Sequence, residues 1–212
     1  MKTPFSPKAS DAQEKGRRLF NELRKEALGE ECDQALCLDL IRQGAEVNGH
    51  YEERNWTPLI FAAQYGFTDI VQSLLDHGAD VDRKNGYDSA ALSYAAYFGR
   101  TDTALLLIEH GADINMQSDK RGETALMRAA GCRREAVVAL LIDKGATATL
   151  KDKNGHTAAD YAAMEGHHTL AHDISVRYTR KVFAEAAEKG TSRPRKIRRR
   201  PGVLPGAPFA RS

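Results

Sequence analysis

The sequence predicts an all-α repeat protein, a solenoid of helix-turn-helix units, because two landmarks recur along the chain in step. The first is a short helix pattern, TPLIFAAQYG at residues 57–66, which returns at shifts of 33 or 34 residues. The second is a Gly-Ala pair that follows a pair of leucine or isoleucine residues at a constant distance. The glycines of this second landmark are Gly44, Gly78, Gly111 and Gly145. Each unit is therefore expected to contain two helices, each ended by a glycine stop or turn.

The first helix of a unit carries its own start and stop signals. Thr57 can accept a backbone N–H as the N-cap, and Pro58 suits the first helical position because that N–H has no partner there. Gly66 suits the left-handed residue that ends a helix. About eight helical residues lie between these signals, fewer than the roughly 12–15 that an isolated helix needs in water. The helices must therefore be supported by neighbouring units.

These motifs resemble the ankyrin repeat family. The stretches TPLIFAAQYG, DIVQSLLDHGADVD and ALLLIEHGADIN are similar to the family pattern of T-P-L-H-x-A-A, V-x-x-L-L and G-A-D-V-N. The resemblance covers roughly residues 22–170, and it implies β-hairpin loops, a concave surface and about five units including the caps. The family histidine after the leucine is absent from every copy, and the slots hold Ile60, Ser93, Met127 and Asp160.

The chain is expected to divide into three segments. A disordered N-terminus covers 1–15, the repeat domain covers 16–189, and a disordered basic tail covers 190–212. The repeat domain begins with a capping unit and ends with a unit that carries a long capping helix. The expected units are 16–48, 49–82, 83–115, 116–149 and 150–189.

Two slots of the repeat pattern, both just before the first helix of a unit, are filled by other residue types in some units. Asn55 and Asp88 stand where later units have glycine, and both residue types tolerate the left-handed conformation. Ala90 stands where threonine would cap, so this helix is expected to rely on Ser89 or Asp88 for its cap.

Composition restricts the class of protein. Apolar residues make up 42% and charged residues 28% of the chain, as in soluble globular proteins. There is no apolar run long enough for a signal peptide or a membrane span. The three cysteines, Cys32, Cys37 and Cys132, form no metal or redox motif. A cytoplasmic protein is expected, with the nucleus as the alternative in a eukaryotic host, and the resemblance implies a monomer.

No motif in the sequence indicates catalysis, a cofactor or a metal. The phosphate-binding G-x-x-x-x-G-K, the G-x-S-x-G elbow and H-E-x-x-H are all missing. His168 and His172 share a helix face, but a metal site needs a third ligand and none is identifiable. The sequence therefore predicts a binding protein that is not an enzyme.

The resemblance implies which positions contact a partner protein. They are the residue before the threonine slot, the two residues after the Ala-Ala pair, and the tips of the loops. The predicted partner-binding residues are Trp56, Gln64, Tyr65, Tyr87, Ser89, Tyr97, Phe98, Glu123 and Cys132. Aromatic residues are frequent anchors of interfaces, although Tyr97 and Phe98 could instead fill the seam between units and Trp56 could cover its neighbouring hairpin.

The C-terminal segment has a different charge from the rest of the chain. Seven of the 31 Lys and Arg residues follow residue 190, together with none of the 29 Asp and Glu residues. The remaining chain therefore has 24 basic and 29 acidic residues, a net charge of −5. The run that could bind a polyanion or direct nuclear import contains Arg193, Arg195, Lys196, Arg198, Arg199 and Arg200. A merely solubilising tail is the other alternative.

The favoured interpretation is a module for protein–protein interaction, acting as an adaptor, inhibitor or assembly factor. The alternative is a polyanion-binding or nuclear-targeted factor that acts through its basic tail.

Overall fold

The structure is a computed structural model of the chain, and it describes residues 7–52 and 54–188. The basic run at 193–200 lies outside the described residues, as does the rest of the segment 190–212. Side chains are described for 11–52 and 54–187.

The short inner helices begin where the threonines cap them. The hydroxyl oxygens of Thr57, Thr124 and Thr157 accept the amide N–H three residues later, at 3.2, 3.3 and 3.4 Å. The inner helices are α3 (Pro58–Tyr65), α5 (Ala91–Phe98), α7 (Ala125–Gly131) and α9 (Ala158–Met164). The expectation of a Ser89 or Asp88 cap is wrong, because Ala90 is the N-cap of α5 and no side chain caps this helix.

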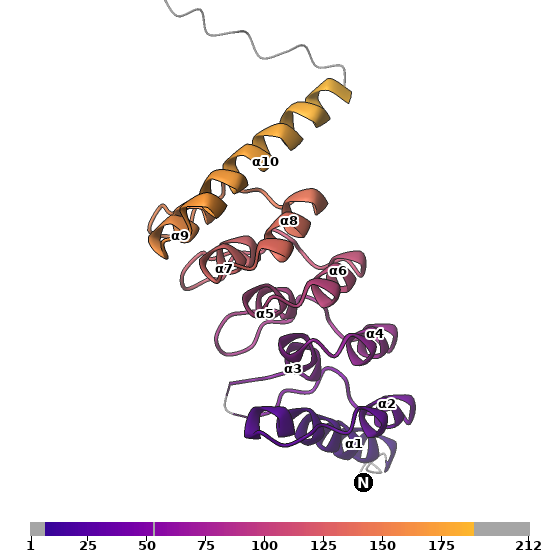
Figure 1. Cartoon of the computed structure of the whole chain (residues 1–212). Helices are drawn as coiled ribbons and strands as arrows, with labels where there is room; N and C mark the ends of the chain where they lie inside the picture. The colour runs from indigo at the N-terminus through magenta and orange to yellow at the C-terminus, as the bar shows by residue number, and fades with distance from the viewer. Residues whose placement is uncertain (1–6, 53, 189–212) are drawn as a thin grey trace, which may run out of the picture.

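Each inner helix pairs with an outer helix, and the pairs stack into a solenoid (Figure 1). The outer helices are α4 (Thr68–Asp76), α6 (Thr101–Glu109), α8 (Glu135–Lys144) and α10 (His168–Glu188). The first pair consists of α1 (Pro7–Arg24), continued by the 3-10 turn η1 (Lys25–Leu28), and α2 (Gln34–Arg42). The all-α solenoid predicted from the sequence is confirmed.

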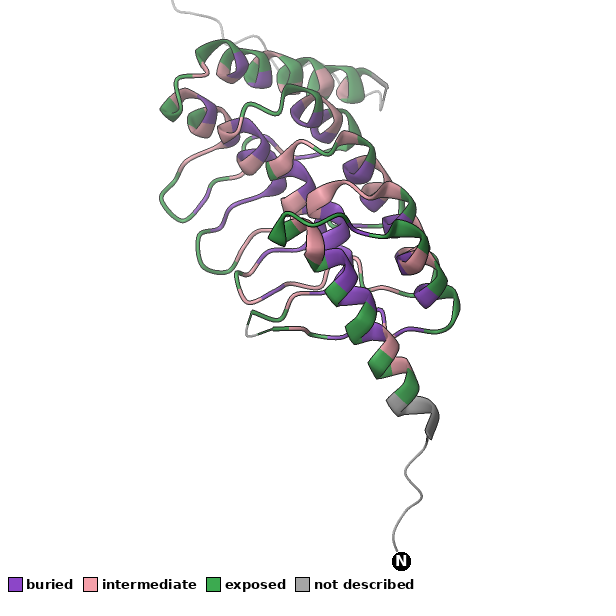
Figure 2. Cartoon of the chain, turned by 60° about the horizontal axis from the view of Figure 1, so that its bottom comes forward, coloured by how far each residue is buried: buried purple, intermediate pink, exposed green. Residues whose placement is uncertain are grey.

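Alanine lets the inner helices approach one another closely. Both members of the Ala-Ala pairs at 62–63, 95–96 and 129–130 are fully buried. The outer helices α4, α6 and α8 each have one fully buried leucine. These are Leu74, Leu107 and Leu141. One unit alone leaves these surfaces open, so the continuous core forms only between neighbours. Figure 2 shows this buried layer running along the stack.

The loops between units turn back on themselves, but they do not form the expected β-hairpins. Within 7–52 and 54–188, the only bridge of strand type joins Tyr51 and Trp56. Later loops are closed by a polar side chain at one repeated position, Asn85, Ser118 or Asp152. Asn85 and Asp152 each accept two amide N–H groups within their own loop, and Ser118 accepts that of Glu123 at 3.1 Å. These side-chain bonds add to one backbone bond in each loop, which the amide N–H of Asn85, Ser118 or Asp152 donates to a carbonyl further along the loop.

The N-terminal segment is more ordered than expected. Residues 7–15 belong to α1, so the prediction that all of 1–15 is disordered is wrong. Further along α1, the apolar side chains of Leu19, Phe20 and Leu23 are at most 2% exposed. Phe20 stacks on Tyr51 with 4.7 Å between ring centroids, and α1 thereby covers the open end of the stack.

The last outer helix is about twice as long as the others and closes the opposite end. Leu170 and Ile174 are buried against the stack, and Tyr178 packs against the same core. Beyond them α10 extends past the neighbouring helix pair, so Val182 and Phe183 are 45% and 55% exposed (Figure 1). None of the described helices combines the length and apolar character needed to cross a bilayer.

Candidate partner-binding groove

A groove of about 610 Å³ runs across three inner helices and three of the loops between units. The inner helices α5, α7 and α9 each contribute residues to it, and the loops before α3, α5 and α7 contribute others. Six of the nine predicted partner-binding residues line this groove together. They are Trp56, Tyr87, Tyr97, Phe98, Glu123 and Cys132.

One half of the groove is aromatic. The Trp56 ring lies 5.1 Å from the Tyr94 ring and 6.1 Å from the Tyr87 ring, measured between centroids. Tyr97 contacts Phe98 edge to face at 5.0 Å. Such edge-to-face pairs stabilise the arrangement by about 0.5–1.5 kcal/mol each beyond their area burial. The rings therefore support one another and hold their positions without a ligand.

Within this aromatic half, two tyrosines remain open to solvent. Tyr87 is 50% exposed and Tyr97 is 44% exposed, whereas Trp56 and Phe98 are half-buried. Trp56 also packs against the core of the stack. The exposed tyrosines supply apolar surface and a hydroxyl at the mouth of the groove.

Arginine side chains of the chain itself lie over the tyrosine rings. The guanidinium of Arg54 lies 4.8 Å from the Tyr87 centroid, and that of Arg128 lies 5.9 Å from the Tyr94 centroid. Both distances lie within the range of cation–π attraction. The aromatic half can therefore bind a cationic or an apolar side chain of a partner.

The other half of the groove is polar and centres on Glu123. Its side chain is 9% exposed, and its carboxylate accepts hydrogen bonds from Arg121 Nη1 at 3.3 Å and Arg128 Nε at 3.4 Å. The Tyr161 hydroxyl also lies 3.2 Å from Glu123 Oε1. The buried charge is therefore fully partnered, while Arg121, 76% exposed, presents its remaining N–H groups to solvent.

Tyr161 connects Glu123 to Asp152, the side chain that closes, or braces, the last loop. Its hydroxyl lies 2.9 Å from Asp152 Oδ2, so a single phenolic proton faces two carboxylates. Burial raises the pKa of the Tyr161 phenol, and the two carboxylates raise it further. Burial also raises the pKa of Asp152, but hydrogen bonds from the His156 amide and the Tyr161 hydroxyl outweigh this effect and lower the pKa overall. Asp152 therefore stays ionised while Tyr161 stays protonated at neutral pH.

Cys132 lies in this groove as a neutral thiol. Burial raises the pKa of the Cys132 thiol, although the nearby Arg134 and Arg128 guanidiniums oppose the change. A thiol with a raised pKa is a poor nucleophile, since only the thiolate attacks. Cys132 therefore contributes to the groove as a packing residue.

Three predicted residues lie outside the groove. Ser89 is 3% exposed, so its prediction as a contact residue is wrong: the amide of Ser89 bonds to Asn85 and the side chain turns inward. Tyr65 stacks between Phe61 and Phe67 on the preceding unit, at 6.2 and 6.0 Å. Gln64 lies beside Tyr65 in α3, and its carbonyl accepts a hydrogen bond from Arg100 Nε at 3.1 Å.

The groove-lining residues that were not predicted include Tyr94, Arg128 and Tyr161. They occupy the same slot of successive units, the residue directly before the Ala-Ala pair. Tyr94 and Tyr161 each bond to the loop brace of their own unit, Asn85 and Asp152. The spacing in the sequence could have predicted this slot as part of the groove. It lies about one helical turn from the positions after Ala-Ala and holds a large residue in every unit.

The described residues hold no group of three His, Cys, Asp or Glu side chains that could bind a metal ion. Cys32 and Cys37 face each other with 3.7 Å between their sulfur atoms, and both are buried. Burial raises the pKa of both thiols, that of Cys37 well above its usual range.

The stacked helix pairs and the open groove define an α-helical repeat protein with a preformed concave surface. The chain belongs to the ankyrin repeat family. Residues 27–118 and 114–175 match the family described as "Ankyrin repeats (3 copies)", which together cover more than half of the chain. Repeats of this family generally mediate protein–protein interaction.

Similar proteins carry the repeats in longer chains. The chain is 34% identical over 141 residues to a putative ankyrin repeat-containing protein of Treponema pallidum, covering 66% of this chain and 36% of that one. It is 32% identical over 130 residues to the palmitoyltransferase AKR1 of Lachancea kluyveri, covering 60% and 18%. It is 41% identical over 86 residues to the human 2-5A-dependent ribonuclease, covering 38% and 12%. The matched part thus spans between about a tenth and little more than a third of these relatives.

Proposed function

We propose that this chain is a non-catalytic module that binds another protein through the aromatic groove and the adjacent loop tips. Its role is that of an adaptor, inhibitor or assembly factor. The observation that supports this most is the groove itself, because it gathers six residues that repeat position alone marks as contacts. The three free cysteines support a reducing compartment such as the cytoplasm.

The chemistry of the groove favours an extended partner segment with two kinds of side chain. An apolar or aromatic side chain fits against Tyr97, which is 44% exposed, and beside the half-buried Trp56. A carboxylate fits next to Arg121, whose guanidinium has N–H groups beyond those that Glu123 uses. Tyr and Trp are frequent hot spots because they bring large contact area at low entropic cost.

The test is capture of partners by the full chain and by a variant that loses the exposed rings. The double variant Y87A/Y97A removes the two tyrosines that are about half exposed, so the fold should be retained. Proteins from the host lysate and peptides from a random displayed library are recovered with each chain and compared. The wild-type chain should recover a defined set that Y87A/Y97A recovers at less than about a tenth of the yield.

The matched control is L28A, which removes an apolar side chain that is 61% exposed at the far end of the stack. L28A should recover the same set as the wild type. Equal recovery by Y87A/Y97A, with an unchanged helical signal in circular dichroism, would contradict binding through the groove.

The basic tail supports a second candidate function, binding of a polyanion. Seven cationic residues and no acidic residue follow residue 190 in a chain whose remainder is acidic. Phosphate contacts release counterions, so binding to double-stranded DNA should weaken steeply as salt rises. A chain that ends at residue 189 should lose this binding. Absence of binding by the full chain at low salt would remove the candidate.

A further inference from the structure

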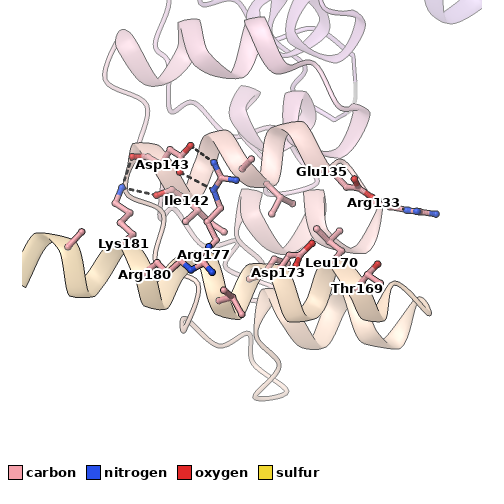
Figure 3. Close-up of a pocket in the computed structure, with 15 residues that line it drawn as sticks. Arg133, Glu135, Ile142, Asp143, Thr169, Leu170, Asp173, Arg177, Arg180 and Lys181 are labelled. Atoms are coloured by element: carbon pink, nitrogen blue, oxygen red, sulfur yellow. Dashed lines mark hydrogen bonds and ion pairs between the residues drawn. The ribbon is translucent and has the colours of Figure 1, made fainter. Parts of the chain in front are cut away.

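A second and larger groove lies between the outer helices α8 and α10, on the side away from the inner helices (Figure 3). Its volume is about 900 Å³. Apolar side chains from both helices form its floor, among them Val138 and Ile142 of α8 and Leu170 and Ile174 of α10. The groove therefore has an apolar floor of largely buried side chains, bordered by charged residues.

Most of the bordering charges already have partners within the chain. Arg133 pairs with Glu135 at 3.1 Å, and Arg177 pairs with Asp143 at 2.6 Å. The Lys181 ammonium donates to the Ile142 carbonyl at 2.8 Å (Figure 3). These contacts fix α10 to the end of α8.

Two lining charges differ from the rest. Asp173 and Arg180 both border the groove, and neither makes an ion pair or hydrogen bond through its side chain within the described part of the chain. They are seven residues apart on α10, which is about two helical turns or ~10.5 Å. Opposite charges at this spacing on one side of a helix can pair with a second helix that runs antiparallel.

The exposed part of α10 continues the same side of the helix. Asp173, Val176, Arg180 and Phe183 follow one another at spacings of three or four residues, so they lie along one stripe. The first three line the groove, and Phe183, 55% exposed, projects beyond the end of α8. A large apolar side chain and an apolar groove are thus neighbours on one surface.

We propose that two copies of this chain associate through α10, with the two helices antiparallel. If the two-fold axis passes between Val176 and Arg177, Asp173 of each copy faces Arg180 of the other. The same register places Phe183 of each copy opposite Leu170 of the other, over the groove floor. The ion pair and the apolar contact then each form twice, as a two-fold interface requires.

A second copy fits this surface because the surface is complementary to itself. The acidic and basic residues without partners occur in equal number, and the protruding ring and its groove occur side by side on α10. The concave groove lies on the inner helices, so it stays open in such a pair. A dimer replaces the monomer that family resemblance implies, and it would present two concave grooves.

The test is sedimentation velocity of the full chain over a range of concentrations, about 1 to 200 µM, because a two-helix interface is small and the dimer should dissociate on dilution. The wild type should shift from monomer to dimer with rising concentration. D173R and R180D each place like charges opposite one another and should weaken association ~10-fold or more. The double variant D173R/R180D exchanges the charges and should restore association.

Two further variants separate the interface from general effects. F183A should also weaken association, while D102R, on the exposed side of α6, should associate as the wild type does. Circular dichroism confirms that each variant is folded. A wild type that remains monomeric at the highest concentration overturns the proposal, and so does a charge exchange that fails to restore association in folded protein.

Discussion

Asp82 occupies a position that asparagine fills in the two neighbouring units. Asn48 Oδ1 accepts the Asp80 amide at 2.8 Å, and Asn115 Oδ1 accepts the Thr147 amide at 2.8 Å. Asp82 accepts the Asp113 amide in the same way, at 3.0 Å. Burial raises the pKa of the Asp82 carboxyl, and the Asp113 and Asp80 charges raise it further, despite this hydrogen bond. The ionised side chain is therefore less stable in the folded chain than in water.

Replacing Asp82 with asparagine should stabilise the protein at pH 7. D82N keeps the acceptor and removes the charge repulsion, so the free energy of unfolding should rise by about 0.5 kcal/mol, as for one exposed charge–charge interaction. Because the folded-state pKa is raised, protonation of Asp82 stabilises the wild type as pH falls through that pKa. The advantage of D82N should therefore shrink toward pH 4 in thermal melts. A D82N chain less stable than the wild type at pH 7 would contradict this assignment.

Arg133 adopts a backbone conformation that glycine adopts at the equivalent position elsewhere. Its φ is +54°, and the equivalent glycines Gly66, Gly99 and Gly166 have φ of 80°, 76° and 78°. The exposed ion pair of Arg133 with Glu135 offsets little of this strain.

R133G should stabilise the chain by about 0.5–1 kcal/mol, because glycine adopts the left-handed conformation without a steric cost. G99A is the matched opposite. It adds the same strain at α5 and places a Cβ 2.8 Å from Arg134 Cδ, so it should destabilise by about 1 kcal/mol. Urea unfolding measures the free energy of unfolding of both variants. If both variants changed it in the same direction, the strain assigned to Arg133 would be contradicted.

Individual side chains show what the sequence could and could not specify. The position after the Ala-Ala pair predicts Tyr97, Phe98 and Cys132, and all three line the groove. The position before the threonine slot predicts Ser89, which is instead buried, and its amide N–H bonds to Asn85. Contacts between a loop and its helix depend on three-dimensional closure of the loop, and no single repeat pattern encodes them.

The inner helix α5 differs from its neighbours in lacking a side-chain cap. Threonine is the N-cap of α3, α7 and α9, whereas Ala90 is the N-cap of α5. Ala90 is 3% exposed. Thr57 and Thr124 are equally buried, so the packing around this slot accepts threonine.

A90T should therefore stabilise the chain by about 1 kcal/mol, the usual effect of an N-cap hydroxyl. Differential scanning calorimetry of A90T and of A90V separates the hydroxyl from the added volume, because valine has the same shape without the acceptor. Equal melting temperatures for the two variants would show that the hydroxyl forms no cap.

Helices were predicted more successfully than loops. Threonine, proline and glycine signals act within a few residues, so the sequence determines where α3 begins and where it ends. Loop conformation depends on bonds that form only when the loop has closed, such as those that Asn85 and Asp152 accept within their own loops, and the resemblance implied strands that are absent from the described loops. The expected disorder failed for residues 7–15 for a similar reason, since this part of α1 is stabilised by packing on α2 and α3 further along the helix.

The stack as a whole should be most stable in its middle and least stable at the free end of α10. Inner helices α5 and α7 are covered on both sides by neighbours, whereas residues 182–187 of α10 contribute no buried side chain. Amide exchange at low protein concentration should therefore be slowest in α5 and α7 and fastest in 182–187. Mass spectrometry of peptic fragments measures this gradient, and uniform protection from α1 to the end of α10 would contradict it.

Repetition accounts for the location of the proposed function. Three consecutive units each bring the same slots to one surface, and in this chain those slots are filled by the single tryptophan and by four of the seven tyrosines. The ends of the stack are closed by α1 and α10, and the aromatic groove lies on the inner helices between these two ends.

The most direct measurement is a titration of the purified chain with a captured partner or selected peptide, followed by the fluorescence of Trp56, the chain's one tryptophan. A peptide without tryptophan keeps the signal specific to the groove. Binding should shift Trp56 emission, and the dissociation constant should rise at least ~10-fold in Y97A while changing less than about twofold in L28A. An unchanged Trp56 emission on saturation, together with equal affinities of the wild type and Y97A, would contradict binding in the groove.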